Sequence, residues 1–249
     1  VADNLDKLLI GKKVCILADP NTVKKDNSFE GVWTQYYLTH INNTILFDFN
    51  IEFEKICFTY ANPMTVCGFI DTYKKSNGKA MIHSGASSAL GKMLIKACLK
   101  EKIELINIVR NEKHIENLKS IGAKYVISTS SKNWKTELRN ISSQLGANIF
   151  FDCFGGIMTS SIFSVFPDKS ICFHYGNLEI KKLGGFDSSE FLFKDKVFRG
   201  WWMTHWIKNI SREELVKWKN YIIEDFKTNS NIFVTGYSKV YPLEQVQQA

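Results

Sequence analysis

A loop of small side chains joins an apolar run to an amphipathic helix near the middle of the chain. Residues 84–91 read Ser-Gly-Ala-Ser-Ser-Ala-Leu-Gly. Small side chains allow a sharp turn and let a ligand approach the main chain. The first N–H groups of the following helix have no partner within that helix, and its dipole favours a negative charge there. The usual occupant of such a loop is the pyrophosphate of a dinucleotide.

The glycine pattern of this loop is incomplete. The three glycine places of G-x-G-x-x-G fall on Ala86, Ser88 and Gly91, so only the last of them is a glycine. The loop therefore predicts a dinucleotide site. A strand–helix–strand unit that binds no nucleotide remains the alternative interpretation of the loop taken by itself.

An arginine follows the next apolar run, where NAD-binding sheets usually place an acidic residue for the ribose hydroxyls. The sequence there is Ile108-Val109-Arg110-Asn111. Val109 cannot accept that hydrogen bond, whereas the planar fork of Arg110 suits a 2′-phosphate. The position therefore favours NADPH over NADH, with an ordinary surface arginine as the alternative.

A parallel sheet is needed to position this loop, and the flanking sequence predicts one. Ala80–His83 is a short apolar run typical of a buried strand, and apolar residues from Leu90 to Cys98 recur at helical spacing. Further runs predict strands at Ile103–Val109, Tyr125–Ile127, Ile149–Phe151, Ile171–Tyr175 and from Val197–Phe198, and helices at Glu112–Ile121 and Trp134–Leu145. Because strands alternate with helices, we expect an α/β fold with a doubly wound parallel sheet.

The two ends of the chain are less regular. The first 61 residues read as β-rich, and a long helix with a capping-box start should follow Ser211. The predicted elements are strands at Val14–Leu17, Val32–Leu38 and Ile45–Phe47, a loop at Asp19–Asn27, a helix from Glu52 or Glu54 that ends before Asn62, helices at Thr65–Tyr73 and Arg212–Phe226, and a β-like tail at Ile232–Tyr241.

Composition excludes several classes of protein. Hydrophobic residues make up 45% and charged residues 23% of the 249 positions, which is typical of a globular chain. The net charge is +7, but the lysines and arginines do not cluster, so we expect no nucleic-acid partner. The six cysteines show no CxxC spacing and indicate reduced core residues of an intracellular protein. No apolar run is long enough to cross a bilayer. The chain begins with Val rather than Met, so we expect a fragment or a processed chain.

Seven motifs follow, in order, those of a known superfamily. They are Gly31-Val32-Trp33-Thr34-Gln35-Tyr36, Asn62-Pro63-Met64-Thr65, Ser87-Ser88-Ala89-Leu90-Gly91, Lys119-Ser120-Ile121-Gly122-Ala123, Asp152-Cys153-Phe154-Gly155-Gly156, Phe193-Lys194-Asp195 with Arg199-Gly200-Trp201-Trp202-Met203, and Tyr241-Pro242-Leu243-Glu244 with Ala249. In these motifs the chain resembles the medium-chain dehydrogenase/reductase superfamily, in its zinc-free branch of quinone oxidoreductases (zeta-crystallin type) and mitochondrial 2-enoyl thioester reductases. The resemblance implies a partial GroES-like catalytic β domain at residues 1–61, a Rossmann-type NADPH-binding domain at 62–228, and an incomplete return segment to the GroES-like domain at 229–249.

The resemblance also implies which residues would hold NADPH. Asn62 and Thr65 would lie near the nicotinamide or its ribose. The pyrophosphate would be held by Ser87, Ser88, Ala89 and Leu90. The 2′-phosphate would be held by Arg110 and Asn111. The nicotinamide side would be lined by Phe154, Gly155, Tyr175, Gly176, Trp201, Trp202 and Met203.

The implied reaction is hydride transfer from NADPH to a quinone or an α,β-unsaturated carbonyl, either an enone or an enoyl thioester. No metal site is expected, because no histidine has a second ligand at metal spacing. His83 and His174 should be core or supporting residues. Tyr36 and Tyr60 are candidates for the proton donor by residue type only, and we expect both to be packed aromatics.

A second function remains open at this stage. The chain would then be a catalytically silent relative that serves as a nucleotide-binding or scaffolding subunit of a larger, mitochondrial assembly. Substrate wall, core and subunit contact all remain open for the tryptophans at 201, 202 and 206. We further expect a small-molecule substrate, a homodimer joined through edge strands, and a location in the cytoplasm or the mitochondrial matrix.

Overall fold

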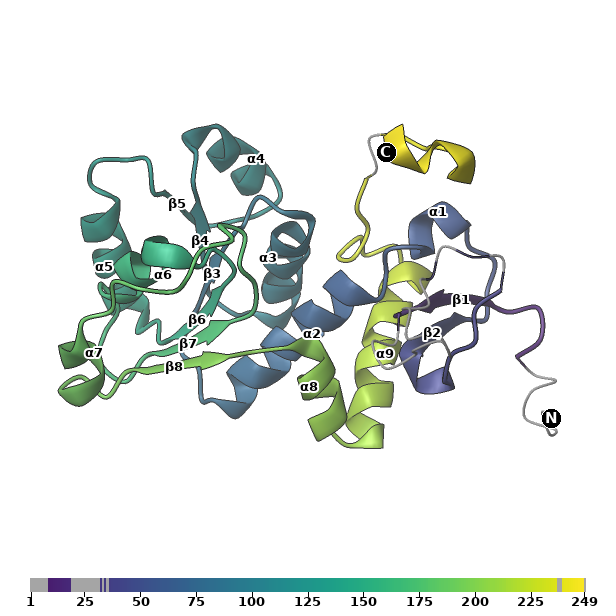
Figure 1. Ribbon diagram of the computed structural model, residues 1–249, viewed down its shortest axis with the longest axis horizontal. Helices are drawn as coiled ribbons and strands as arrows, with labels where there is room; N and C mark the ends of the chain where they lie inside the picture. Colours follow the sequence, from purple (N-terminus) through teal and green to yellow (C-terminus); the bar gives the residue numbers. More distant parts are fainter. Residues whose placement is uncertain (1–8, 19–31, 33, 35, 237–238, 249) are drawn as a thin grey trace.

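A six-stranded parallel sheet forms the centre of the larger part of the molecule (Figure 1). The computed structural model describes residues 9–18, 32, 34, 36–236 and 239–248. The strands are β3 (Met81–Ser84), β4 (Leu105–Val109), β5 (Tyr125–Ser128), β6 (Ile149–Asp152), β7 (Ile171–His174) and β8 (Val197–Gly200). Their order in the sheet is β5-β4-β3-β6-β7-β8, and neighbours are parallel. The strand order reverses at β3, so the predicted doubly wound α/β sheet is confirmed.

Helices cover both faces of this sheet. The α-helices are α1 (Phe53–Ile56), α2 (Ala61–Lys75), α3 (Ala89–Glu101), α4 (Ile115–Ser120), α5 (Trp134–Leu145), α6 (Gly156–Phe163), α7 (Ser188–Leu192), α8 (Met203–Asn209) and α9 (Arg212–Lys227), and the 3-10 helices are η2 (Ile41–Asn43), η3 (Glu112–His114) and η4 (Leu243–Gln248). One buried cluster packs α2, α3 and α9 against one face, and a second packs α5 and α6 against the other. Strands buried on both sides explain the mostly apolar sequences of β3, β4 and β6.

Local sequence sets the ends of the best-predicted helices. Ser211 and Glu214 form the expected capping box at the start of α9. Gly146 ends α5 in the left-handed region at φ 62°. The predicted bounds of α5 are confirmed, and α9 extends one residue beyond its predicted end at Phe226.

The smaller part contains an antiparallel pair, β1 (Lys13–Ile16) with β2 (Thr44–Phe47), which lies beside α9 (Figure 1). The rings of Phe47 and Phe226 join it to α9, with their centroids 5.8 Å apart. The strands predicted around residues 14–17 and 45–47 are therefore confirmed. Assignment of this part to a GroES-like domain, and the domain boundaries, stay predictions.

Two β predictions are wrong. The described residues of Val32–Leu38 form no strand, and Tyr36 and Leu38 there are largely exposed. The described residues of Ile232–Tyr241 also form no strand; instead, Asp225 of α9 accepts the N–H groups of Ile232 and Phe233. In both segments, aromatic and β-branched composition predicted a strand, but no neighbouring strand supplies hydrogen bonds among the described residues. The predicted loop at Asp19–Asn27 lies outside them.

Several helix boundaries also differ from prediction. The helix expected from Glu52 or Glu54 covers only Phe53–Ile56, and α2 starts before Pro63 rather than after it. Proline is tolerated there because first-turn N–H groups need no partner within the helix. The sequence did not indicate α6, α7 or α8.

Five cysteines are buried, Cys57 is exposed, and all six are free. The prediction of reduced, mostly core cysteines is therefore confirmed. Among the described residues, no helix combines the length and the apolar character needed to span a membrane.

Candidate functional site

The loop after β3 forms the predicted helix-terminus site. Gly85 adopts φ 73°, and a Cβ added there would lie 2.6 Å from Cys153 Sγ, so glycine is required at this turn. Ser88 is the N-cap of α3, and its Oγ accepts the N–H of Gly91 at 3.0 Å. The N–H groups of Ala89 and Leu90 keep no main-chain partner among the described residues.

Gly91 supplies the close packing that the last glycine of such loops provides. A Cβ on Gly91 would lie 2.4 Å from the carbonyl oxygen of Ala86. Gly85 therefore makes the turn in place of the missing glycine at Ala86, and Gly91 lets the helix approach the loop, whereas Ser88 serves as the N-cap of α3.

A cleft of about 560 Å³, here called the α3 cleft, opens beside this loop. Five of the predicted site residues line it, namely Ser87, Ser88, Arg110, Asn111 and Phe154, together with the neighbouring Gly85, Val109 and Leu178. The guanidinium carbon of Arg110 lies 5.8 Å from the centre of the Phe154 ring. Arg110 is exposed and forms no ion pair with any described residue.

Two further basic residues, which were not predicted from the sequence, line the α3 cleft. Lys113 and His114 lie in the 3-10 turn after β4, next to Arg110. The Asn111 side chain caps that turn by accepting the N–H of Lys113 at 3.0 Å. The sequence Arg-Asn-Glu-Lys-His at 110–114 could have predicted this cluster, because residues directly after a strand lie at its carboxyl end. The cleft thus combines the loop at the start of α3 with basic side chains, which suits a phosphate-bearing ligand.

A buried carboxylate organises the loop that carries Phe154. Asp152 is fully buried, and its Oδ2 accepts from Thr159 Oγ1 at 2.6 Å and lies 2.9 Å from His174 Nδ1. Its Oδ1 accepts from Ser84 Oγ at 2.9 Å and from the N–H of Phe154 at 3.2 Å. Such charge-assisted bonds hold the loop rigid, so Asp152 sets the position of Phe154 against Arg110.

The same edge of the sheet buries a histidine–tyrosine pair. His83 Nε2 lies 2.7 Å from Tyr175 Oη, and the two rings stack with centroids 5.8 Å apart. Burial lowers the pKa of His83 to about 3, and the nearby Asp152 charge only partly opposes this. Burial also raises the pKa of Tyr175 well above its usual value. Both groups are therefore neutral near pH 7, and the prediction that His83 is a core residue is confirmed.

The remaining predicted site residues do not line the α3 cleft. Ala89 and Leu90 form the first turn of α3, while Gly155 caps α6 and Gly176 packs against Cys153. Asn62 and Thr65 lie half-buried in the first turns of α2. Their roles, like those of Tyr175 and the tryptophan segment, stay predictions.

The tryptophan segment packs on α2. Trp201 donates its Nε1–H to Thr72 at 3.0 Å, and Trp206 donates to Asp71 at 2.8 Å. Trp206 is therefore a core residue between α2 and α8, and the partly buried Trp201 packs against that core. Trp202 is 52% exposed, and Met203 is buried at the start of α8.

Neither tyrosine proposed as a proton donor is placed at the α3 cleft. Tyr60 is buried and donates to the carbonyl of Asn42 at 3.1 Å, which confirms it as a packed aromatic. Tyr36 is 87% exposed, so the same prediction for Tyr36 is wrong. Within the described ranges, no group of three or more His, Cys, Asp or Glu side chains is arranged to hold a metal ion.

Comparison with known proteins agrees with this architecture. Residues 89–218, about half of the chain, match the zinc-binding dehydrogenase family. The mitochondrial enoyl-[acyl-carrier-protein] reductase of Arabidopsis thaliana is 26% identical, in an alignment that covers 71% of this chain and 48% of the reductase. That of Caenorhabditis elegans is 27% identical, in an alignment that covers 79% of this chain and 57% of the reductase. The chain thus spans about half the length of the curated relatives it matches.

Solved structures share the fold. A putative NADPH:quinone reductase from Bacillus thuringiensis superposes with a TM-score of 0.78 at 19% identity, covering 96% of this chain and 74% of that one. The Etr1p/NADP/crotonyl-CoA complex superposes with a TM-score of 0.66 at 21% identity, covering 80% and 58%. The chain therefore belongs to the zinc-binding dehydrogenase family, within the zinc-free branch of the medium-chain dehydrogenase/reductase superfamily that contains quinone oxidoreductases and 2-enoyl thioester reductases.

Proposed function

We propose that this protein is an NADPH-dependent, zinc-independent oxidoreductase that reduces an α,β-unsaturated carbonyl, in particular an enoyl thioester, or a quinone. The observation that carries the proposal is the α3 cleft, whose lining joins the loop at the start of α3 to a cluster of basic side chains. The names of the relatives support it, since they are enoyl reductases and NADPH:quinone reductases. The mitochondrial names of the curated relatives favour the mitochondrial matrix.

In this proposal each part of the α3 cleft has one task. The N–H groups of Ala89 and Leu90 would bind the pyrophosphate, and Ser88 keeps its hydroxyl hydrogen to donate there. Arg110, with Lys113 beside it, would bind the 2′-phosphate. When bound, NADPH would supply the hydride. Phe154 would support the guanidinium of Arg110 by a cation–π contact.

Two measurements test this proposal. NADPH fluorescence titration should show saturable binding, tighter for NADPH than for NADH. Oxidation of NADPH, followed by its absorbance, should then be accelerated by crotonyl-CoA or by a quinone. Absence of NADPH binding would refute the proposal. Binding without turnover of either acceptor would instead favour the catalytically silent, scaffolding function.

We also propose a homodimer joined at the β8 edge of the sheet. β8 is the terminal strand, and three of its four residues are exposed or nearly so. Leu192 and Phe193, just before it, are 73% and 82% exposed. An open edge strand beside exposed apolar residues favours pairing with a second chain. Sedimentation velocity should show a dimer, and a monomer at micromolar concentration would contradict this proposal.

A further inference from the structure

A groove of about 600 Å³, here called the α9 groove, runs between η2 and β2 on one side and α9 on the other. It lies in the smaller part of the molecule, where β2 and α9 lie side by side (Figure 1). Lys219 of α9 lines this groove and is half-buried. The α9 groove and the α3 cleft share no lining residue, so the groove is separate from the proposed cofactor site. Its apolar walls are the side chains of Ile41, Leu46, Val216 and Ile223.

The amine of Lys219 has no carboxylate partner. Its Nζ donates to the main-chain carbonyl of Asn42 at 2.8 Å, which is a neutral acceptor. Lys219 forms no ion pair with any residue that the structure describes. The two carboxylates that line the groove both lie nearer to Lys227, with Asp48 at 3.8 Å and Glu224 at 3.5 Å from its Nζ. The amine of Lys219 is therefore held in the groove by one neutral hydrogen bond.

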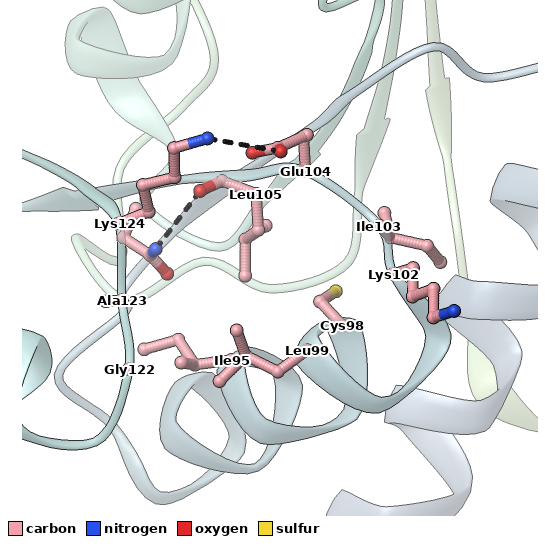
Figure 2. Close-up of a pocket in the computed structure, with 11 residues that line it drawn as sticks. Ile95, Cys98, Leu99, Lys102, Ile103, Glu104, Leu105, Gly122, Ala123 and Lys124 are labelled. Atoms are coloured by element: carbon pink, nitrogen blue, oxygen red, sulfur yellow. Dashed lines mark hydrogen bonds and ion pairs between the residues drawn. The ribbon is translucent and has the colours of Figure 1, made fainter.

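Burial without a counter-charge favours the neutral form of this amine. It lowers the pKa of Lys219 to about 8. Lys124 provides a contrast, because it lines the pocket between α3 and the start of β4 and lies 3.3 Å from Glu104 (Figure 2). Hydrogen bonds to Tyr125 and Glu104 raise the pKa of Lys124. The titratable groups around Lys219 are Asp48, Glu224 and Lys227 in the groove lining, Tyr60, which donates to the same Asn42 carbonyl, and His40, which caps η2.

We propose that Lys219 is an acylation site, at which the amine takes the acyl group of an acyl thioester whose apolar chain lies in the α9 groove. A lysine that is desolvated in an apolar pocket is an activated nucleophile, because only the neutral amine attacks a carbonyl. The nitrogen forms an amide bond with the thioester carbonyl carbon, and the carbon–sulfur bond breaks. The thiolate that leaves takes up the proton that the nitrogen loses, so no further reactant is needed. The proposal does not depend on the proposed reductase function.

A matched pair of thioesters, S-octanoyl- and S-acetyl-N-acetylcysteamine, tests this proposal. The folded protein is incubated with each at pH 7.5, and the acylated fraction of each lysine is followed by peptide mass spectrometry. With the octanoyl probe, Lys219 should react at least about tenfold faster than Lys124. At this pH an amine of pKa 8 is neutral about 200-fold more often than one of pKa 10.5, and its lower nucleophilicity offsets part of the gain. Lys219 should also react at least about fivefold faster with the octanoyl than with the acetyl probe, because the longer chain buries methylene groups in the groove.

Three controls separate this site from general lysine reactivity. Between pH 7 and pH 10 the rate at Lys219 should level off above about pH 9, whereas the rate at Lys124 should continue to rise. Unfolding the protein in urea should abolish the preference for Lys219, because the preference comes from burial. Lys219→Arg keeps the positive charge and should remove the fast-reacting site without creating another. Equal rates at Lys219 and Lys124, a preference that persists in urea, or equal rates with the two probes at Lys219 would each overturn the proposal.

Discussion

The buried imidazole of His83 makes the stability of this protein depend on pH in a predictable direction. Its pKa is lowered to about 3 in the folded chain, against 6.5 for an ordinary histidine. Below pH 6.5 the unfolded chain binds a proton that the folded chain does not, so stability falls as the pH is lowered toward 3. Between pH 7 and pH 5, the difference in proton binding at this one residue should lower the free energy of unfolding by about 2 kcal/mol.

Urea unfolding followed by tryptophan fluorescence at pH 7 and pH 5 measures this effect. His83→Gln has no titrating group at the buried position, so its loss of stability between the two pH values should be about 2 kcal/mol smaller than that of the natural chain. His205→Gln removes an exposed histidine and should leave the loss unchanged. If His83→Gln and the natural chain lose equal stability, His83 is not held neutral by burial, and the reasoning is wrong.

Four other outcomes are expected. Arg110→Ala should weaken NADPH binding by roughly 10- to 100-fold, the value of one charge-assisted hydrogen bond, with little effect on NADH binding. Arg139→Ala, at an exposed position of α5, should change neither affinity. Equal losses for both cofactors in a fluorescence titration would remove the 2′-phosphate role. Asp152→Ala leaves several buried donors unpaired and should cost about 3–5 kcal/mol in urea unfolding, and a loss below 1 kcal/mol would contradict its organising role. Ser211→Ala removes an exposed helix cap and should cost only about 1 kcal/mol in the same assay. A chelator such as EDTA should leave NADPH oxidation unchanged, and a chelator-sensitive rate would contradict the zinc-independent proposal.

Local sequence determined the regular elements. The central strands of the sheet were predictable because both of their faces are buried, so their sequences are mostly apolar. The helix α5 and the capped start of α9 were predictable because Gly146 and Ser211 act on their own neighbouring backbone. The position of Arg110 was also predictable, since a residue directly after a strand must lie at the carboxyl edge of the sheet.

Contacts between distant segments were not predictable from composition. The segment 232–241 has β-forming residues, but Asp225 of α9 accepts the N–H groups of Ile232 and Phe233 instead. The packing of Trp201 on α2 depends on Thr72, which is 129 positions away in sequence. The sequence equally did not predict that Asp152 joins Ser84, Thr159 and His174, because their pairing requires β3, β6, β7 and α6 to be assembled.

The sequence by itself determined an alternating α/β chain, a loop suited to phosphate and an arginine beside it, because each of these depends on residues within one turn or one strand. Only the tertiary structure decided that Gly85 makes the turn, that Lys113 and His114 join Arg110, and that Asn107 Oδ1 has no hydrogen-bond partner among the described residues. These features depend on which side chains meet across the sheet, and such meetings follow from the packing of the whole domain.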